Sequence, residues 1–360
     1  MSDHFTEPVR GINADPRPLG MAGLDATLAY VHGSLPAVPV HHLTGLRPTE
    51  ASLGRSTFAM PVTSWLADNA GIIEPGMLAF VVDAPLASAI YTGLRPGQVV
   101  TTSELSLTFI QPVHRDASGL SARASVVHAN RQVGVSAAEV EDSSGRLLAH
   151  ATTRCVIHTV PGDAEQAAAP GAAPVAAPET TDLPDPYQRP ARGTVYPAEL
   201  WDTMAGLQFC QALVDGSLDH GPAGYLLGTR MVAADEGTTT WRMPTSRWLC
   251  AAGPTLYGGA VACLAQLAQD LSIMTTLPTG TVFATLDLKV HFLRPVLPGT
   301  GDLTATGEVV HRGRSIAVSQ VRITNDRGKT VAMSSGSALL VPDGVRRMRG
   351  GELPTPVVEG

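Results

Sequence analysis

The chain repeats itself at a fixed offset of 183 residues. Residues 60–155 align with residues 243–338 without a gap, and 26 of the 96 pairs are identical. The identical pairs include Met60/Met243, Pro61/Pro244, Trp65/Trp248, Gly76/Gly259, Phe109/Phe292, Pro112/Pro295, His128/His311, Arg131/Arg314 and Gly145/Gly328. An ungapped match of this length predicts one module present twice. Positions at which the copies differ in chemistry then indicate which copy keeps which part of a site.

Size and composition fit two folded domains. The chain has 360 residues and a mass of 37.5 kDa, with 44% hydrophobic and 16% charged residues, which is typical of globular rather than disordered sequence. The net charge is −7 and no Lys/Arg block stands out. Nucleic acid and anionic membranes are therefore poor candidate partners.

The first residues lack the pattern of a signal peptide, so we expect a cytoplasmic protein.

The order of segments predicts five regions. We expect a loosely held tail over 1–40 with about one helical turn, a first module over 41–160, and a second over 196–345. The Ala/Pro-rich stretch within 161–195 predicts an extended, mobile linker, and 346–360 predicts a second tail. An amphipathic helix over 198–216 is expected to lead into the second module.

Each module reads as one long helix followed by antiparallel strands. Glycine-led apolar segments of helical length occupy 75–92 and 258–276. Alternating segments follow, and the turns at 143–145 and 326–328 predict hairpins. Within 285–292, alternation predicts that Leu286 and Leu288 point to one face and Thr285 to the other. The helix would then cover the apolar face of the sheet, which makes the class α+β.

These residues resemble the hotdog-fold acyl-CoA thioesterases of the phenylacetate-pathway (PaaI) type. The resemblance rests on Met60-Pro61-Val62-Thr63, Asn69-Ala70-Gly71, Phe109-Ile110-Gln111-Pro112, Tyr257-Gly258-Gly259, Phe292-Leu293-Arg294-Pro295 and Arg312-Gly313-Arg314. It covers both copies, so it implies a tandem double hotdog, as in the acyl-CoA thioesterases of type II. The family carries a His before a Gly-Gly pair and a carboxylate further along the helix. Here Glu74 and Tyr257 stand at the His position, and we interpret both as rim residues.

The resemblance implies a site shared between modules. Asp83 lies seven residues past Gly76, roughly 10 Å along the same helix, so it cannot easily serve its own helix start. It can serve the Gly258-Gly259 turn of the second module, where backbone N–H groups would bind the oxyanion. We therefore predict one competent site with Asp83 as general base or nucleophile. The opposite site pairs Gln266 with Gly76 and is predicted to have lost its carboxylate.

Further site residues follow from the same resemblance. Thr102 or its counterpart Thr285 is expected to help hold the attacking water, and the two cannot be separated at this stage. Arg312 and Arg314 are candidates for the phosphates of coenzyme A, and Tyr257, Gly76 and Gln266 complete the expected binding residues. Pro85 interrupts the helical hydrogen bonds and would either displace or aim Asp83.

These features predict hydrolysis of an acyl thioester, either acyl-CoA or an acyl carrier thioester. No metal or other cofactor is expected, coenzyme A being part of the substrate, and the expected assembly is a homodimer of double hotdogs. Two alternatives stay open. The first is a non-catalytic acyl-CoA-binding or assembly protein, which the missing His and Gln266 favour. The second is a hotdog hydratase or dehydratase, for which we find no adjacent Asp and His after a strand.

Overall fold

The computed structural model describes residues 3–113, 117–160 and 183–345. In this part of the chain twelve strands form one antiparallel sheet, in the order β1-β2-β4-β5-β6-β3-β9-β12-β11-β10-β8-β7. The first module contributes β1 (Arg47–Ser52), β2 (Arg55–Pro61), β3 (Gln98–Phe109), β4 (Gly119–Ala129), β5 (Val133–Asp142) and β6 (Leu147–Thr159). The second contributes β7 (Arg230–Asp235), β8 (Thr238–Pro244), β9 (Val282–Phe292), β10 (Asp302–Arg312), β11 (Ile316–Thr324) and β12 (Thr330–Val341). The fold is a double hotdog, as the resemblance implied.

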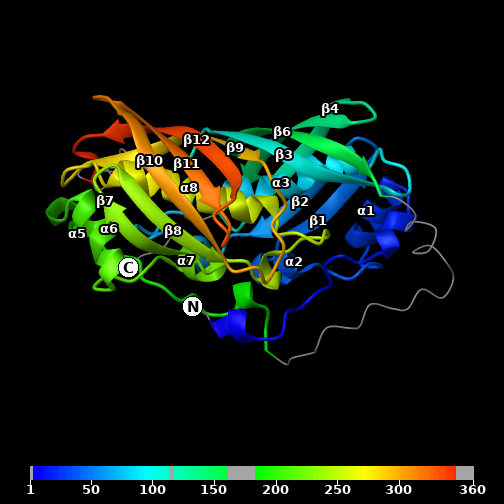
Figure 1. Ribbon diagram of the computed structural model, residues 1–360, viewed down its shortest axis with the longest axis horizontal. Coiled ribbons are helices and arrows are strands. Elements are labelled where there is room, and N and C mark those ends of the chain that lie inside the picture. Colours follow the sequence, from blue (N-terminus) through cyan, green and yellow to red (C-terminus); the bar gives the residue numbers. More distant parts are fainter. Residues whose placement is uncertain (1–2, 114–116, 161–182, 346–360) are drawn as a thin grey trace.

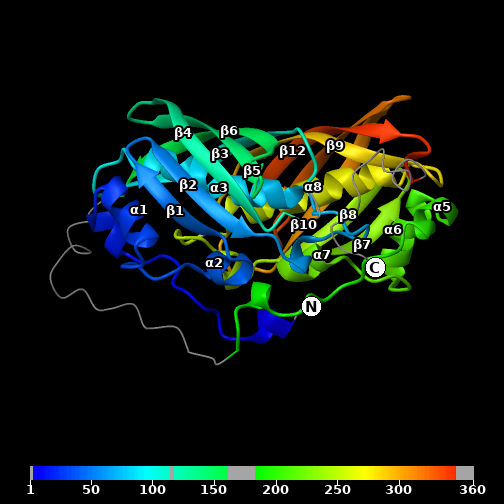
Figure 2. The same ribbon diagram turned by 180° about the vertical axis from the view of Figure 1, so that it is seen from behind.

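The two modules join edge to edge through β3 and β9. These strands pair antiparallel, with Leu105 opposite Val290 and Leu107 opposite Leu288. All four side chains are buried, so the joint is also part of the core. One continuous curved sheet results, and it covers both central helices (Figures 1 and 2).

The long helices lie side by side at the centre of the molecule. Helix α3 (Gly76–Tyr91) and helix α8 (Gly258–Met274) pack against each other and against the concave face of the sheet. Most of their side chains are buried on every face, as expected for helices that are apolar all round. The predicted helical segments at 75–92 and 258–276 are therefore confirmed. No helix in the described residues is long and apolar enough to cross a membrane.

The duplication extends further towards the N-terminus than expected. Helices α1 (Gly23–Val31) and α2 (Pro39–Thr44) correspond at the same offset to α6 (Gly206–Asp215) and α7 (Pro222–Leu227). Ten of the 23 pairs between 23–45 and 206–228 are identical. A Cβ on Gly23 would lie 1.7 Å from the Tyr91 carbonyl oxygen, and one on Gly206 would lie 1.8 Å from that of Met274. Residues 23–40, expected to be a loose tail, instead form a packed part of the first module.

The helix expected over 198–216 is divided in two. Helix α5 (Glu199–Thr203) ends at Met204, and α6 starts after Ala205, whose backbone is extended. The close approach of Gly206 to the end of α8 fixes where α6 can begin, so the chain must turn before it. At the offset of 183, α5 corresponds to a 3-10 helix of the first module, η2 (Arg17–Gly20).

Short 3-10 helices and a segment near the end of the linker pack on the surface of the two modules. The 3-10 helices are η1 (Asp3–Thr6), η2 (Arg17–Gly20), η3 (Ser64–Leu66), η4 (Pro186–Gln188) and η5 (Arg247–Leu249). Asp185, near the end of the expected linker, accepts hydrogen bonds from Arg10 at 2.8 Å and His42 at 3.1 Å. Residues 161–182 of that linker, and the tail over 346–360, lie outside the described residues.

Both predicted hairpins are present, between β5 and β6 and between β11 and β12. The stretch 301–328, which reads as one alternating segment, contains two strands joined by a turn at 313–315. Trp65 and Trp248 are 3% and 0% exposed, so both belong to the core.

Candidate active site

The structure brings Asp83 to the helix start of the other module, as the resemblance implied. The Gly259 N–H donates to Asp83 Oδ2 at 3.0 Å, and the Thr102 hydroxyl donates to Oδ1 at 3.1 Å. A Cβ on Gly258 would lie 2.7 Å from Oδ2, so any other residue there would displace the carboxylate. Burial raises the pKa of Asp83 to about 6, against the lowering effect of the Thr102 and Gly259 hydrogen bonds. The Gly259 N–H is thus engaged by the aspartate, and an oxyanion role for it stays a prediction.

Tyr257 fills the space next to this contact. Its hydroxyl donates to the Phe80 carbonyl at 2.5 Å and accepts the Ala84 N–H at 2.9 Å. The hydroxyl therefore bridges the N–H of residue 84 and the carbonyl of residue 80, which are partners in a regular α-helix. This bridge lies one position before Pro85, which has no N–H to donate, and helix α3 continues through Pro85. Tyr257 is 5% exposed, so it is an interior residue and the interpretation as a rim residue was wrong.

The opposite contact also exists, but with different chemistry. Gln266 occupies the place of Asp83 and accepts the Gly76 N–H at 3.1 Å. Its amide nitrogen donates to Asp270 Oδ2, and the Thr285 hydroxyl donates to the same oxygen. The prediction that this site has lost its carboxylate was wrong. The carboxylate comes from Asp270, one helical turn later on the same face of α8.

A β-bulge next to Thr102 and another next to Thr285 set the direction of each side chain. The register of β3 shifts at Ser103, and that of β9 shifts at Leu286. An extra residue in a strand reverses the alternation beyond it. Thr102 and Thr285 therefore turn towards the helices, where they reach Asp83 and Asp270. The alternation in the sequence had placed Thr285 on the opposite face, because a bulge leaves no mark in a hydrophobic pattern.

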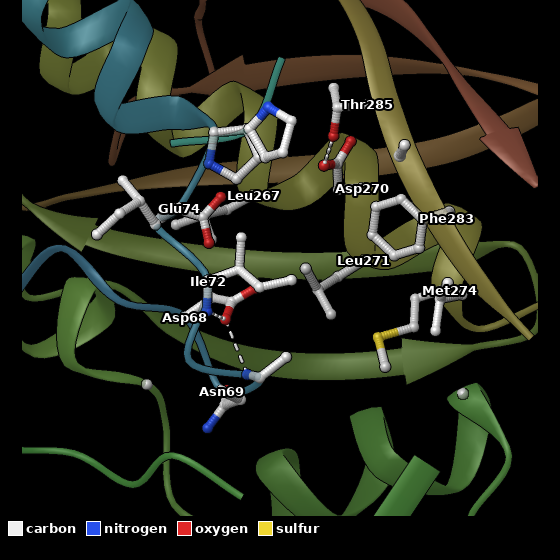
Figure 3. Close-up of a pocket in the computed structure, with 18 of the residues that line it drawn as sticks. Asp68, Asn69, Ile72, Glu74, Leu267, Asp270, Leu271, Met274, Phe283 and Thr285 are labelled. Carbon is white, nitrogen blue, oxygen red and sulfur yellow. Dashed lines mark hydrogen bonds between the residues drawn. The ribbon is translucent and has the colours of Figure 1, made fainter. Parts of the chain in front are cut away.

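A cavity of about 480 Å³ opens beside Asp270 (Figure 3). One part of its wall is polar and is formed by Asp68, Asn69, Glu74, Asp270 and Thr285. Most of the remainder is apolar and comes from both modules, including Ile73, Leu78, Phe109, Trp201, Phe209, Leu213, Leu267, Leu271, Met274 and Phe283. A mostly apolar cavity with a few converging polar groups is the usual form of a ligand site.

Asp270 lines this wall and has one oxygen without a hydrogen-bond partner. The residue is 3% exposed, and its Oδ1 is a buried atom with no partner within the described residues. Burial raises the pKa of Asp270 to about 7, against the lowering effect of the Thr285, Gln266 and Gln269 side chains. An unpaired buried oxygen is unfavourable in the resting protein, so a water or ligand that reached it would gain a hydrogen bond.

Two further acids lie close to Asp270. Glu74 is 5% exposed and lines the cavity, so the interpretation as a rim residue was wrong for it too. Burial, with the nearby charges of Asp68 and Asp270, raises its pKa well above the usual range. Burial also raises the pKa of Asp68 to about 6, although its carboxylate accepts the N–H groups of Ala70 and Ile72.

The remaining candidates lie apart from the cavity. Asp83, Gly258, Gly259, Tyr257 and Thr102 are not among its lining residues. Arg312 is exposed and donates to the Thr276 hydroxyl at 3.1 Å, and Arg314 lies exposed in the turn after β10. Their role at coenzyme A phosphates stays a prediction. Sequence reasoning missed Asp270 and Asp68, although the i,i+4 spacing of Gln266 and Asp270 was a usable signal.

The comparisons with known proteins agree with this architecture. The thioesterase superfamily profile matches residues 71–149 and 253–332, one stretch in each module. A Halobacterium salinarum protein named "Putative esterase" is 33% identical over 118 residues, 31% of this chain and 74% of that protein. The chain belongs to the thioesterase superfamily.

One further relative and one solved structure are similar to this chain. The acyl-coenzyme A thioesterase PaaI of Escherichia coli is 29% identical over 112 residues, 31% of this chain and 77% of that protein. The structure of a tesB protein from Mycobacterium avium subspecies paratuberculosis has a TM-score of 0.50 and 12% identity. That match covers 89% of this chain and 100% of the other, so the double hotdog is shared across both modules.

Proposed function

We propose that this protein hydrolyses acyl thioesters, with acyl-CoA as the favoured substrate, in the cavity beside Asp270. The observation that carries the proposal is the buried Asp270 carboxylate, which has one unpartnered oxygen and belongs to a residue that lines a mainly apolar cavity. Its superfamily, and the relative named as an acyl-coenzyme A thioesterase, supply the reaction class. This assigns the reaction to the Gln266 side of the molecule, opposite to the expectation from sequence.

The arrangement around Asp270 suits general-base catalysis. Thr285 and Gln266 both donate to Oδ2, which fixes the carboxylate and leaves Oδ1 to accept a proton from water. The water oxygen attacks the thioester carbon, and the carbonyl π electrons move onto its oxygen. When the intermediate collapses, the C–S bond breaks, and the sulfur leaves with the bonding electrons and takes the proton from Asp270. The products are a carboxylic acid and a thiol.

The pH dependence follows from the ionised form being the base. Because burial raises the pKa of Asp270 to about 7, the active carboxylate forms as the pH rises through that value. We therefore expect kcat/KM to rise with pH on the acidic side with a midpoint near 7. An enzyme whose base had an ordinary aspartate pKa would reach its plateau about three pH units lower.

The apolar wall supports an acyl chain as the buried part of the substrate. Side chains from α6, α8 and β9 form much of the apolar wall, including Phe209, Leu271 and Phe283. The polar wall would then receive the thioester group, with the thiol portion directed outwards. An acyl chain on a carrier protein offers the same buried chemistry, so both thiol sources belong in the assay.

Thiol release from acetyl-, butanoyl-, octanoyl-, palmitoyl- and phenylacetyl-CoA, and from an octanoyl carrier protein, tests the proposal. Asp270→Asn is expected to lower kcat/KM by about 10²–10⁴, the usual range for loss of a general base. The matched variant Asp83→Asn removes the equivalent buried charge of the other site and is expected to keep activity within about threefold, well under the 1.4 kcal/mol of a tenfold change. Loss of activity in Asp83→Asn but not in Asp270→Asn would show that the reaction takes place at the Asp83 site. Binding without turnover of any thioester would favour a non-catalytic acyl-binding protein.

A further inference from the structure

The start of helix α3 has no free backbone donor for a substrate carbonyl. Pro75 lacks an N–H group, and the Gly76 N–H is bonded to Gln266. The next two N–H groups, of Met77 and Leu78, donate to the carbonyls of Glu74 and Pro75 at 2.8 and 2.9 Å. A helix start ordinarily offers unpaired N–H groups to a developing negative charge. At this cavity, that charge must be stabilised by another group.

Glu74 is the side chain in the right place. It directly precedes Pro75, is almost fully buried, and has its carboxyl group turned into the cavity that Asp270 also lines (Figure 3). The titratable groups that face it are Asp68 in its own loop, and Asp270 and Cys263 on α8. None of these is a cation that would hold Glu74 ionised.

We propose that Glu74 is a catalytic residue that donates its carboxylic acid O–H to the carbonyl oxygen of the bound thioester. The inference rests on the proposed function and adds a hydrogen-bond donor to it. Glu74 replaces the amide that Pro75 removes from the helix start.

The protonation states of the two acids support this division of roles. Burial and the charges of Asp68 and Asp270 raise the pKa of Glu74 well above its usual range, and only the Gly76 N–H acts in the other direction. Asp270 receives hydrogen bonds from Thr285 and Gln266, which favour its ionised form over that of Glu74. Its charge then helps to keep Glu74 neutral. Neighbouring carboxyl groups whose environments separate their pKa values are a known way to obtain an acid and a base at one site.

Glu74 acts as a hydrogen-bond donor throughout hydrolysis and transfers no proton. As water attacks, the carbonyl oxygen gains the π electron pair, and the Glu74 O–H bond to it shortens without transferring its proton. Collapse of the intermediate re-forms the C=O bond and expels the thiolate, which takes the proton held by Asp270. Glu74 therefore ends the cycle protonated, as it began.

Substitutions of Glu74 distinguish a role as hydrogen-bond donor from a role as base. Glu74→Gln keeps an N–H donor of similar shape and is expected to retain kcat/KM within about tenfold, whereas Glu74→Met removes the donor and is expected to lose about 10²–10³, as for a single oxyanion donor. On the alkaline side, wild-type activity is expected to fall as Glu74 ionises, and Glu74→Gln to remain level. A Gln variant as inactive as Met would show that Glu74 acts in its ionised form and overturn the proposal. Full activity in the Met variant would overturn it as well.

Infrared spectroscopy of a bound thioester tests the hydrogen bond from Glu74 independently of turnover. Octanoyl-CoA with a ¹³C-labelled carbonyl is bound to Asp270→Asn, and the infrared C=O band is compared with that of Asp270→Asn/Glu74→Met. We expect a shift to lower frequency in the first variant and its loss in the second, with thermal unfolding confirming that both are folded. If the band of Asp270→Asn is unshifted while the wild-type protein hydrolyses the substrate, the role of Glu74 alone is overturned. A Glu74-dependent shift in a protein without turnover overturns the proposed function alone, and no binding overturns both.

Discussion

The two contacts between the modules occupy equivalent positions and have diverged in opposite directions. On one side Asp83 is bonded to the Gly259 N–H, and Tyr257 fills the adjacent space. On the other side Gln266 takes the same backbone bond, Glu74 replaces the tyrosine, and Asp270 adds a carboxylate at a cavity. The first contact closes the joint between α3 and α8, and the second leaves room for a ligand. The comparison teaches that a carboxylate beside a glycine turn does not by itself mark the reaction centre.

The difference extends to the cavity walls. Leu213 and Met274 line the cavity in the second module. At the same offset the first module carries Tyr30 and Tyr91. Tyr30 packs against the core, and Tyr91 is the last residue of α3, with its hydroxyl donating to the Pro18 carbonyl at 3.3 Å. Both rings are larger than the leucine and methionine at the equivalent positions. A homodimer of identical modules could not differ in this way, whereas a fused chain can.

Filling the cavity is the strongest way to break the comparison. The double variant Leu213→Tyr/Met274→Tyr copies the first module and is expected to lower kcat/KM for octanoyl-CoA by about 100-fold, or about 2.7 kcal/mol, with thermal stability kept. The reverse exchange, Tyr30→Leu/Tyr91→Met, is expected to leave hydrolysis nearly unchanged. Comparable losses in both double variants would contradict the assignment of the cavity.

Removing the Tyr257 hydroxyl tests the structural side of the comparison. Tyr257→Phe leaves the Phe80 carbonyl and the Ala84 N–H without their bridge, and we expect a loss of about 2 kcal/mol in the free energy of unfolding. Chemical denaturation measures this loss. The matched variant Tyr91→Phe removes one longer, partly buried bond and is expected to cost about 0.5 kcal/mol. Equal values would argue against a special role for the bridge.

The paired threonines sharpen the functional side. Thr285→Ala removes one of the two donors to Asp270 Oδ2, and kcat/KM is expected to fall by about tenfold, equivalent to about 1.4 kcal/mol. Thr102→Ala removes the equivalent donor to Asp83 and is expected to change activity by less than about twofold. Steady-state thiol release on both variants decides between the sites, and a larger effect at Thr102 would favour Asp83.

Stability as a function of pH tests the raised pKa of Asp270 itself. The pKa of Asp270 is raised to about 7 in the folded protein, above its unfolded value of about 3.9. Its contribution is therefore fully present below pH 4 and is lost as the pH rises towards 7. Asp270→Asn should become more stable relative to the wild type by at most about 4 kcal/mol between pH 4 and pH 8, because each pKa unit corresponds to about 1.4 kcal/mol. Parallel stability curves would show that Asp270 has no raised pKa.

The sequence by itself determined the duplication, the α+β class and both central helices. These follow from local patterns and from the fixed offset between the copies. The pairing of each helix start with the opposite helix was implied by the resemblance to the hotdog thioesterases. The packed helices at 23–45 were also readable, because the same offset relates Gly23 to Gly206 and Pro39 to Pro222. Extending the self-comparison upstream would have revealed them.

Only the tertiary structure decided which side holds the cavity. Whether space remains beside a carboxylate depends on the volume of side chains brought from several elements, such as Tyr257 on one side and Leu213 on the other. The bulges that turn Thr102 and Thr285 inwards depend on register with neighbouring strands, which no periodicity encodes. The pKa values of Glu74 and Asp270 likewise arise from burial and from charges that meet only after folding.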